Sequence, residues 1–181
     1  MKAVRRKNLN RSVSLCIIMY TIVLDSDGFI KLLKAGLPFG SIGDFKFVIP
    51  EEVFEEVVTE GKKGLHEDAF IAEGLINRKM IVVVHNKEKI RQPDERLGKG
   101  ELAAKQTFSE QKAFAILSDD KQFIERLLQQ GIPFITTADF IVLLAERKAV
   151  SVEEAKVLLG RLRPFIDDER YGRMSRILEG K

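Results

Sequence analysis

Two hydrophobic patterns alternate along most of this chain. Short runs of β-branched and aliphatic residues are separated by longer segments in which apolar residues recur three or four positions apart. The short runs are typical of buried strands, and the longer segments are typical of helices. We expect strands at about 20–25, 46–50, 80–85, 114–118 and 133–136. Strands that alternate with helices predict a three-layer α/β/α domain around a mainly parallel sheet of four to five strands.

Helical spacing accounts for most of the remaining sequence. We expect helices at 26–36, 51–61, 65–79, about 100–111, 119–131, 138–149, 151–163 and about 167–178, with a polar loop at 86–98. No repeat or linker divides the chain, so residues 19–181 are expected to form one domain with C-terminal helices. Residues 1–18 are expected to be a basic extension that is either disordered or the product of a misassigned start, with Met19 as the natural one.

Composition narrows the function classes. With 45% hydrophobic and 31% charged residues, the 181-residue chain is expected to be soluble, and no apolar run approaches the ~18 residues of a membrane span. A single cysteine excludes an internal disulfide framework and fits a reducing cytoplasm. One cysteine and two histidines also argue against a Cys/His zinc site. A metal would therefore have to be a hard cation held by carboxylates.

The net charge of +3 does not describe the folded part of the chain. Residues 1–24 hold five cations and no acid, so the remainder carries −2. Bulk charge therefore does not predict nucleic-acid binding by the domain, and any basic surface must come from local clusters.

Acidic residues follow several of the predicted strands. Asp25 ends the first strand, Asp119 and Asp120 end the fourth, and Glu101 lies in the first turn of a helix. Singly, each is explained as a helix cap or as an acid that complements the helix dipole. Glu56 is harder to explain in this way, because it lies beyond the first turn and beside the apolar helix face.

Taken together, these acids predict a cation site. The carboxyl ends of parallel strands share one edge of a sheet, where ligands bind. Carboxylates that converge there repel one another and raise each other's pKa, and a divalent cation relieves that repulsion. Such a cation activates water and stabilises the charge that builds up on a phosphate during hydrolysis.

The segment VLDSDG resembles the first motif of haloacid dehalogenase-type phosphatases. That resemblance implies Asp25 as the nucleophile and Asp27 as the acid/base. The sequence departs from the motif at Phe29, where the family has Thr or Val, and only Asp119–Asp120 matches the family's distal acid pair.

Four segments in order resemble the PIN domain, a family of Mg²⁺/Mn²⁺-dependent ribonucleases that includes VapC-like toxins and RNA-processing nucleases. They are VLDSDGFIKL, VIPEEVFEEV, LGKGELAA (similar to a Leu-Gly-x-Gly-Glu segment of one subgroup) and AILSDDKQF. The likeness covers about residues 20–178, and its four segments occur in the family's order. It implies an endoribonuclease, a hydrolase of RNA phosphodiester bonds.

The PIN resemblance implies a role for each matching residue. The catalytic set is Asp25, Glu56, Glu101 and Asp120, and the metal ligands are Asp25, Glu101 and Asp120, with Asp119 as a secondary candidate. Ser26 and Ser118 are implied to support the site. The adjacent aspartates leave open which carboxylate points inward, and Asp27 becomes an ordinary residue of the first helical turn.

RNA requires cations beside an acidic pocket. Lys99 and Lys121 adjoin the proposed acids, and Arg161 and Arg163 belong to a C-terminal basic cluster, although solvated helix faces explain these four equally well. The resemblance also allows a toxin with an antitoxin partner, and a homodimer. Two alternatives stay open: the phosphatase, and a non-catalytic RNA- or protein-binding PIN module.

Overall fold

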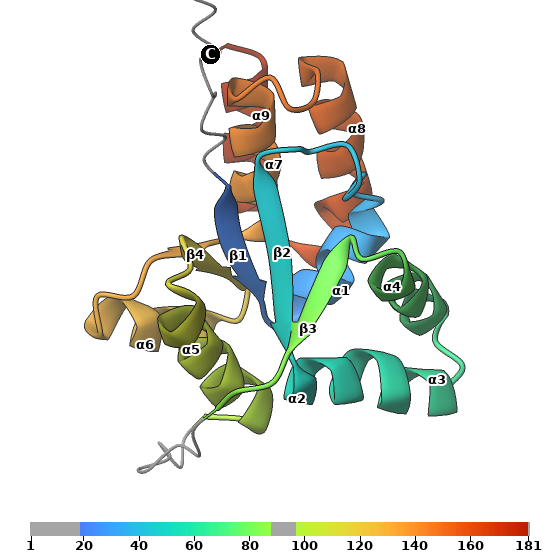
Figure 1. The fold of residues 1–181 in the computed structure, drawn as a ribbon. Coiled ribbons are helices and arrows are strands. Elements are labelled where there is room, and N and C mark those ends of the chain that lie inside the picture. Colours follow the sequence, from blue (N-terminus) through green and yellow to red (C-terminus); the bar gives the residue numbers. More distant parts are fainter. Residues whose placement is uncertain (1–18, 88–96, 181) are drawn as a thin grey trace, which may run out of the picture.

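A five-stranded parallel sheet forms the centre of the computed structural model, which describes residues 19–87 and 97–180 (Figure 1). The strands are β1 (Tyr20–Leu24), β2 (Phe45–Pro50), β3 (Ile81–Val84), β4 (Ala115–Leu117) and β5 (Phe134–Ile135), in the order β3-β2-β1-β4-β5. Each pair of neighbouring strands is parallel. The α/β fold with a parallel sheet of four to five strands is confirmed. Residues 1–18 and most of the predicted loop 86–98 lie outside the described residues.

Helices occupy nearly all of the predicted intervals. They are α1 (Ser26–Ala35), α2 (Glu51–Phe54), the π-helical segment η1 (Glu55–Glu60), α3 (Gly61–Lys63), α4 (Glu67–Asn77), α5 (Lys99–Gln111), α6 (Lys121–Gln129), α7 (Thr137–Glu146), α8 (Val152–Leu162), the 3₁₀ segment η2 (Arg163–Phe165) and α9 (Asp168–Leu178). None of those helices within residues 19–87 and 97–180 is long and apolar enough to cross a membrane.

The predicted helix 51–61 differs from the observed one. The observed helix widens into η1 and continues through Gly61 into α3. Gly61 has helical backbone angles (φ −58°) and not those of a helix stop. A Cβ atom at Gly61 would lie 2.9 Å from the Cβ of Ala69, so this glycine allows α3 and α4 to approach closely. Its role is packing and not termination.

The side chains of β1 alternate between the two faces of the sheet. Ile22 and Leu24 belong to the larger hydrophobic cluster, to which α1, α7 and α8 contribute. Val23 belongs to a second cluster, which includes Ala104 of α5 and Phe123 of α6. Buried strands with apolar residues on both faces are typical of parallel sheets covered by helices on each side. The three layers therefore agree with the prediction.

Three helices begin at the carboxyl edge of the sheet and bring polar side chains there. Asp25 follows β1 and caps α1, Pro50 ends β2 and precedes α2, and Asp120 follows β4 and caps α6. This edge is where a parallel sheet binds ligands.

Candidate functional site

An acidic pocket of about 600 Å³ lies at this edge of the sheet. Its lining comes from α1, α2, η1, the start of α5 and the cap of α6, and consists of Asp25, Ser26, Asp27, Glu52, Glu55, Glu56, Glu60, Gly98, Lys99, Gly100, Glu101 and Asp120. The structure thus brings together the four acids of the predicted catalytic set. These four acids span nearly a hundred residues of the sequence, and they come together at the carboxyl edge of the sheet.

Asp25 is the most deeply buried acid of the pocket. Its side chain caps α1, and Oδ1 accepts a hydrogen bond of 2.7 Å from the backbone N–H of Gly28. Burial raises the pKa of Asp25 to about 7, although hydrogen bonds from Ser118 and Gly28 act to lower it. The neighbouring charges of Asp27 and Asp119 raise the pKa further. Near neutral pH, the Asp25 carboxyl group is therefore divided between its protonated and ionised forms.

Glu101 is held at the start of α5 by a backbone hydrogen bond, and its surroundings raise its pKa. It lies three residues after the cap of α5, and its Oε2 accepts a 2.9 Å hydrogen bond from the backbone N–H of Gly98, which closes a capping box. Partial burial raises the pKa of Glu101, and the charges of Asp120 and Glu56 act in the same direction. The hydrogen bond from Gly98 and the positive charge of Arg126 oppose that rise.

Asp120 is joined to Asp25 through a buried serine. Oδ1 of Asp120 accepts a 2.8 Å hydrogen bond from the Phe123 N–H and so caps α6. Its own N–H donates to Ser118 Oγ at 3.2 Å, and Ser118 also hydrogen-bonds to the Asp25 side chain. The fully buried Ser118 therefore fixes the two strand ends relative to each other.

Glu56 reaches the pocket from η1. Its Oε2 accepts a 2.6 Å hydrogen bond from Ser26 Oγ. A Cβ atom at Gly100 would lie 3.3 Å from the same oxygen, so the start of α5 passes close to Glu56. Single π-helical turns are frequent at functional sites, and this one carries Glu56.

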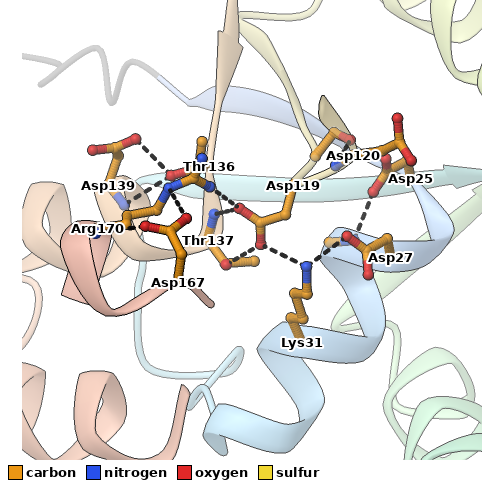
Figure 2. Close-up of polar contacts among 12 residues, drawn as sticks. Asp25, Asp27, Lys31, Asp119, Asp120, Thr136, Thr137, Asp139, Asp167 and Arg170 are labelled. Carbon is orange, nitrogen blue, oxygen red and sulfur yellow. Dashed lines mark hydrogen bonds and ion pairs between the residues drawn. The ribbon is translucent and has the colours of Figure 1, made fainter. Parts of the chain in front are cut away.

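Asp119 turns away from the pocket (Figure 2). Its Oδ1 accepts hydrogen bonds from the Thr137 N–H at 3.2 Å and from Arg170 Nη1 at 3.1 Å. Its Oδ2 accepts a hydrogen bond from the Thr137 hydroxyl and lies 3.7 Å from Lys31 Nζ. The prediction left open which adjacent aspartate faces the site. Asp120 lines the pocket and Asp119 does not, so we do not keep Asp119 as a ligand.

Asp27 lies in the first turn of α1 and also lines the pocket. Its carboxylate is 2.7 Å from Lys31 Nζ, one turn later in the same helix. This pairing is that of an ordinary i,i+4 helix contact.

The donor set of the pocket suits a hard cation. Carboxylate oxygens are the ligands that Mg²⁺ and Mn²⁺ prefer. Glu56, Glu101 and Asp120 each give one oxygen to a protein hydrogen bond, and Asp25 accepts hydrogen bonds from Gly28 and Ser118. Across residues 19–87 and 97–180, no three His, Cys, Asp or Glu side chains are arranged to hold a metal as they stand. Binding would require some of these side chains to turn.

The predicted RNA-binding cations fall into two groups. Lys99 lines the pocket, and Lys121 is the exposed first residue of α6, next to Asp120. Arg161 instead lies 3.5 Å from the carbonyl of Ala35, at the opposite end of α1 from the pocket. Arg163 stacks over the Tyr171 ring, 5.0 Å from its centre. The structure therefore brings the two lysines, and not Arg161, to the acids.

Sequence reasoning missed several residues that shape the pocket. Gly28 holds Asp25 through its N–H, and Gly98 does the same for Glu101. Arg126 Nη1 is, in the part of the chain that is described, the one buried side-chain polar atom with no hydrogen-bond partner. The spacing S/T/D-x-x-G after a strand signals the first of these contacts, whereas Arg126 has no local signal.

The chain is similar to known proteins over most of its length. The model of a family described as PIN domain matches residues 21–175. Among solved structures, a PilT N-terminus domain protein from Sulfolobus solfataricus is similar, with 21% identity and a TM-score of 0.45 over 72% of this chain and 94% of that one. The search of curated proteins gave no significant match.

Proposed function

Because the chain belongs to the PIN-domain family, whose members are generally nucleases, we propose that it is a Mg²⁺- or Mn²⁺-dependent endoribonuclease. The substrate is a phosphodiester bond in single-stranded RNA, and the reaction is hydrolysis. A cation bound among the carboxylates would activate a water molecule and stabilise the negative charge that develops on the phosphate.

The observation that supports this proposal best is the raised pKa of two acids that line one pocket. Burial raises the pKa of both Asp25 and Glu101, and neighbouring carboxylates raise each of them further. Ionising all of these acids without a counter-charge is unfavourable, and a divalent cation removes that cost. Perturbed carboxyl groups that line a pocket are typical of functional sites.

The acids and serines at this edge of the sheet have three roles in the proposal. Asp25, Glu101 and Asp120 hold the cation, directly or through water. Glu56, oriented by the Ser26 hydroxyl at 2.6 Å, accepts a hydrogen bond from the attacking water and orients it. Ser118 keeps Asp25 and Asp120 in register.

The RNA backbone requires positive charge beside these acids. Lys99 in the pocket lining and Lys121 at the start of α6 are the cations that we propose contact the phosphates flanking the cleaved bond. We do not assign this role to Arg161, which interacts with the other end of α1.

The wider biological setting is part of the same proposal. We also propose a cytoplasmic location, the toxin of a toxin–antitoxin pair as one role, and a homodimer as the assembly. An upstream neighbouring gene that encodes a small DNA-binding protein would support the toxin role. Its absence would favour an RNA-processing role.

The phosphatase alternative is not carried forward. It requires Asp27 to donate a proton to a leaving group, whereas the Asp27 carboxylate pairs with Lys31 and the family match is to PIN domains. Asp27→Asn is accordingly expected to leave RNA cleavage within about threefold of the unchanged protein.

The test is cleavage of a labelled single-stranded RNA in Mn²⁺, in Mg²⁺ and in EDTA. We expect cleavage in either metal, none in EDTA, and losses of at least about 100-fold in Asp25→Asn and Asp120→Asn. Asp44→Asn, an exposed loop residue outside the pocket, serves as the matched control. Equal cleavage by all variants would overturn the assignment. RNA binding that persists in EDTA, without cleavage in either metal, would indicate a non-catalytic binding module.

A further inference from the structure

Asp119 is a buried carboxylate at which three helices meet. Only 1% of its side chain is exposed, and its partners are Lys31 of α1, Thr137 of α7 and Arg170 of α9 (Figure 2). A buried carboxylate is tolerated only when charged or hydrogen-bonding partners compensate for its lost hydration. Loss of any one partner therefore disturbs the position of Asp119 itself.

The position of Asp119 matters because its neighbour in the chain lines the acidic pocket. Asp120 follows directly, caps α6 and accepts its hydrogen bond from Phe123. Asp119 and Asp120 share one planar peptide unit, so a backbone displacement of Asp119 also moves the amide nitrogen of Asp120. Asp119 has a second connection to the pocket, through Lys31. Lys31 Nζ lies near Asp119 and also pairs at 2.7 Å with Asp27, which lines the pocket.

Arg170 is held in place by Asp167 of its own helix end as well as by Asp119. Its backbone N–H donates to Asp167 Oδ1 at 2.8 Å, which caps α9. Its Nε lies 3.8 Å from Asp167 Oδ2, and only 18% of its side chain is exposed. α9 packs on α7 and α8 and supplies no residue to the pocket lining. The Arg170–Asp119 pair is thus an ionic connection from this helix to the end of β4.

We propose that Arg170 is a positioning residue for the acidic pocket: through Asp119 it fixes the segment 118–123, and the C-terminal helix thereby determines where Asp120 lies. The effect on catalysis rests on the proposed nuclease function. The effect on the position of residues 118–123 does not, because it concerns the protein without metal or RNA.

The first experiment measures amide hydrogen exchange in the full-length, metal-free protein. Arg170→Gln removes the charge and keeps a polar side chain, and Arg173→Gln makes the same change at an exposed position of the same helix. We expect exchange in 118–123 to accelerate by about tenfold in Arg170→Gln and to stay unchanged in Arg173→Gln. Exchange in β2 serves as the internal reference. Equal acceleration in β2 and in 118–123, or no acceleration at all, would overturn the proposal.

The second experiment asks whether Arg170 acts through Asp119. In an Asp119→Asn background the charged partner is already lost, so Arg170→Gln is expected to add less than about twofold to the exchange of 118–123. Independent, multiplicative effects of the two substitutions would show that Arg170 acts by another route and would contradict the inference.

The third experiment connects position to chemistry. Arg170→Gln is expected to lower kcat for RNA by about 10- to 100-fold and to weaken Mn²⁺ binding, while KM changes by less than about threefold. A change confined to KM would indicate that Arg170 contacts RNA and would overturn the positioning role. If the unchanged protein neither binds Mn²⁺ nor cleaves RNA, the nuclease proposal fails, and the exchange experiment still decides the role of Arg170.

Discussion

Ser26 Oγ donates a 2.6 Å hydrogen bond to Glu56 Oε2, although the two residues are thirty positions apart and lie on different helices. The contact joins the first residue of α1 to the π-helical segment η1. It holds a long, exposed side chain in one of its rotamers over the pocket. Fixing a side chain in advance of the reaction is how supporting residues contribute to rate.

The first prediction follows from this hydrogen bond. Ser26→Ala frees Glu56 and is expected to lower kcat by about 3- to 10-fold, whereas Glu56→Gln removes the carboxylate proposed to orient the attacking water and lowers kcat by about 100-fold or more. Ser26→Thr keeps the hydroxyl group and is the matched control. Steady-state cleavage of labelled RNA measures all three variants. A Ser26→Ala enzyme as slow as Glu56→Gln would indicate that Ser26 has a second role.

The second prediction concerns stability and pH in the absence of metal. The pKa of Asp25 is about 7 in the folded protein, against 3.8 for an ordinary aspartate, so the folded state binds the proton more tightly than the unfolded state. Stability from this group is therefore fully present below about pH 4 and is lost as pH rises through 7. The loss amounts to at most about 4 kcal/mol above pH 8.

Asp25→Asn removes that dependence. We expect the variant to be more stable than the unchanged protein at pH 8 by about 2–4 kcal/mol, and the difference to shrink toward zero at pH 4. Urea denaturation in EDTA at several pH values measures it, with exposed Asp44→Asn as the control. A difference that stays constant with pH would show that folding does not raise the pKa of Asp25. Added Mn²⁺ is expected to stabilise the unchanged protein and not Asp25→Asn.

The third prediction concerns Arg126, whose positive charge lowers the pKa of Glu101. Arg126→Gln removes this charge, so the pKa of Glu101 rises and protons compete better with a cation. Mn²⁺ binding is expected to weaken by about 3- to 10-fold at pH 6 and by less at pH 8. Calorimetric titration at both pH values measures the effect. Arg126→Lys keeps the charge and is expected to keep the wild-type pH dependence. An equal loss at both pH values would mean that Arg126 acts through packing instead.

Local signals made much of the fold and part of the site predictable. The stop of α1 at Gly36 was expected, and Gly36 adopts the left-handed conformation (φ 74°) that favours glycine at a helix end. Asp25 and Asp120 each follow a strand and cap the next helix. Those caps place both carboxylates at one edge of a parallel sheet, so their shared pocket follows from local sequence and topology together.

The orientation of Asp119 and Asp120 was not predictable, because it depends on distant partners. Arg170, which holds Asp119, is 51 positions away, and no local pattern connects the two residues. The continuation of the helix through Gly61 was missed for a similar reason. The close approach of Ala69 in α4 accounts for a glycine at this position, whereas a glycine considered in its local sequence alone is read as a stop.

The last prediction tests how tightly Asp25 is enclosed. A Cβ atom at Gly28 would lie 2.5 Å from Leu117 Cδ2, 2.7 Å from the Leu117 carbonyl oxygen and 2.9 Å from Asp25 Oδ1. The carbonyl belongs to the sheet and cannot move cheaply, so Gly28→Ala is expected to cost about 1–3 kcal/mol of unfolding free energy and to displace Asp25. Gly160→Ala is the matched control, because the same methyl group in α8 meets nothing within 4 Å. It is expected to stabilise the protein by about 0.5–1 kcal/mol. Urea denaturation measures both variants, and a Gly28→Ala protein as stable as Gly160→Ala would show that α1 does not pack against β4 this closely.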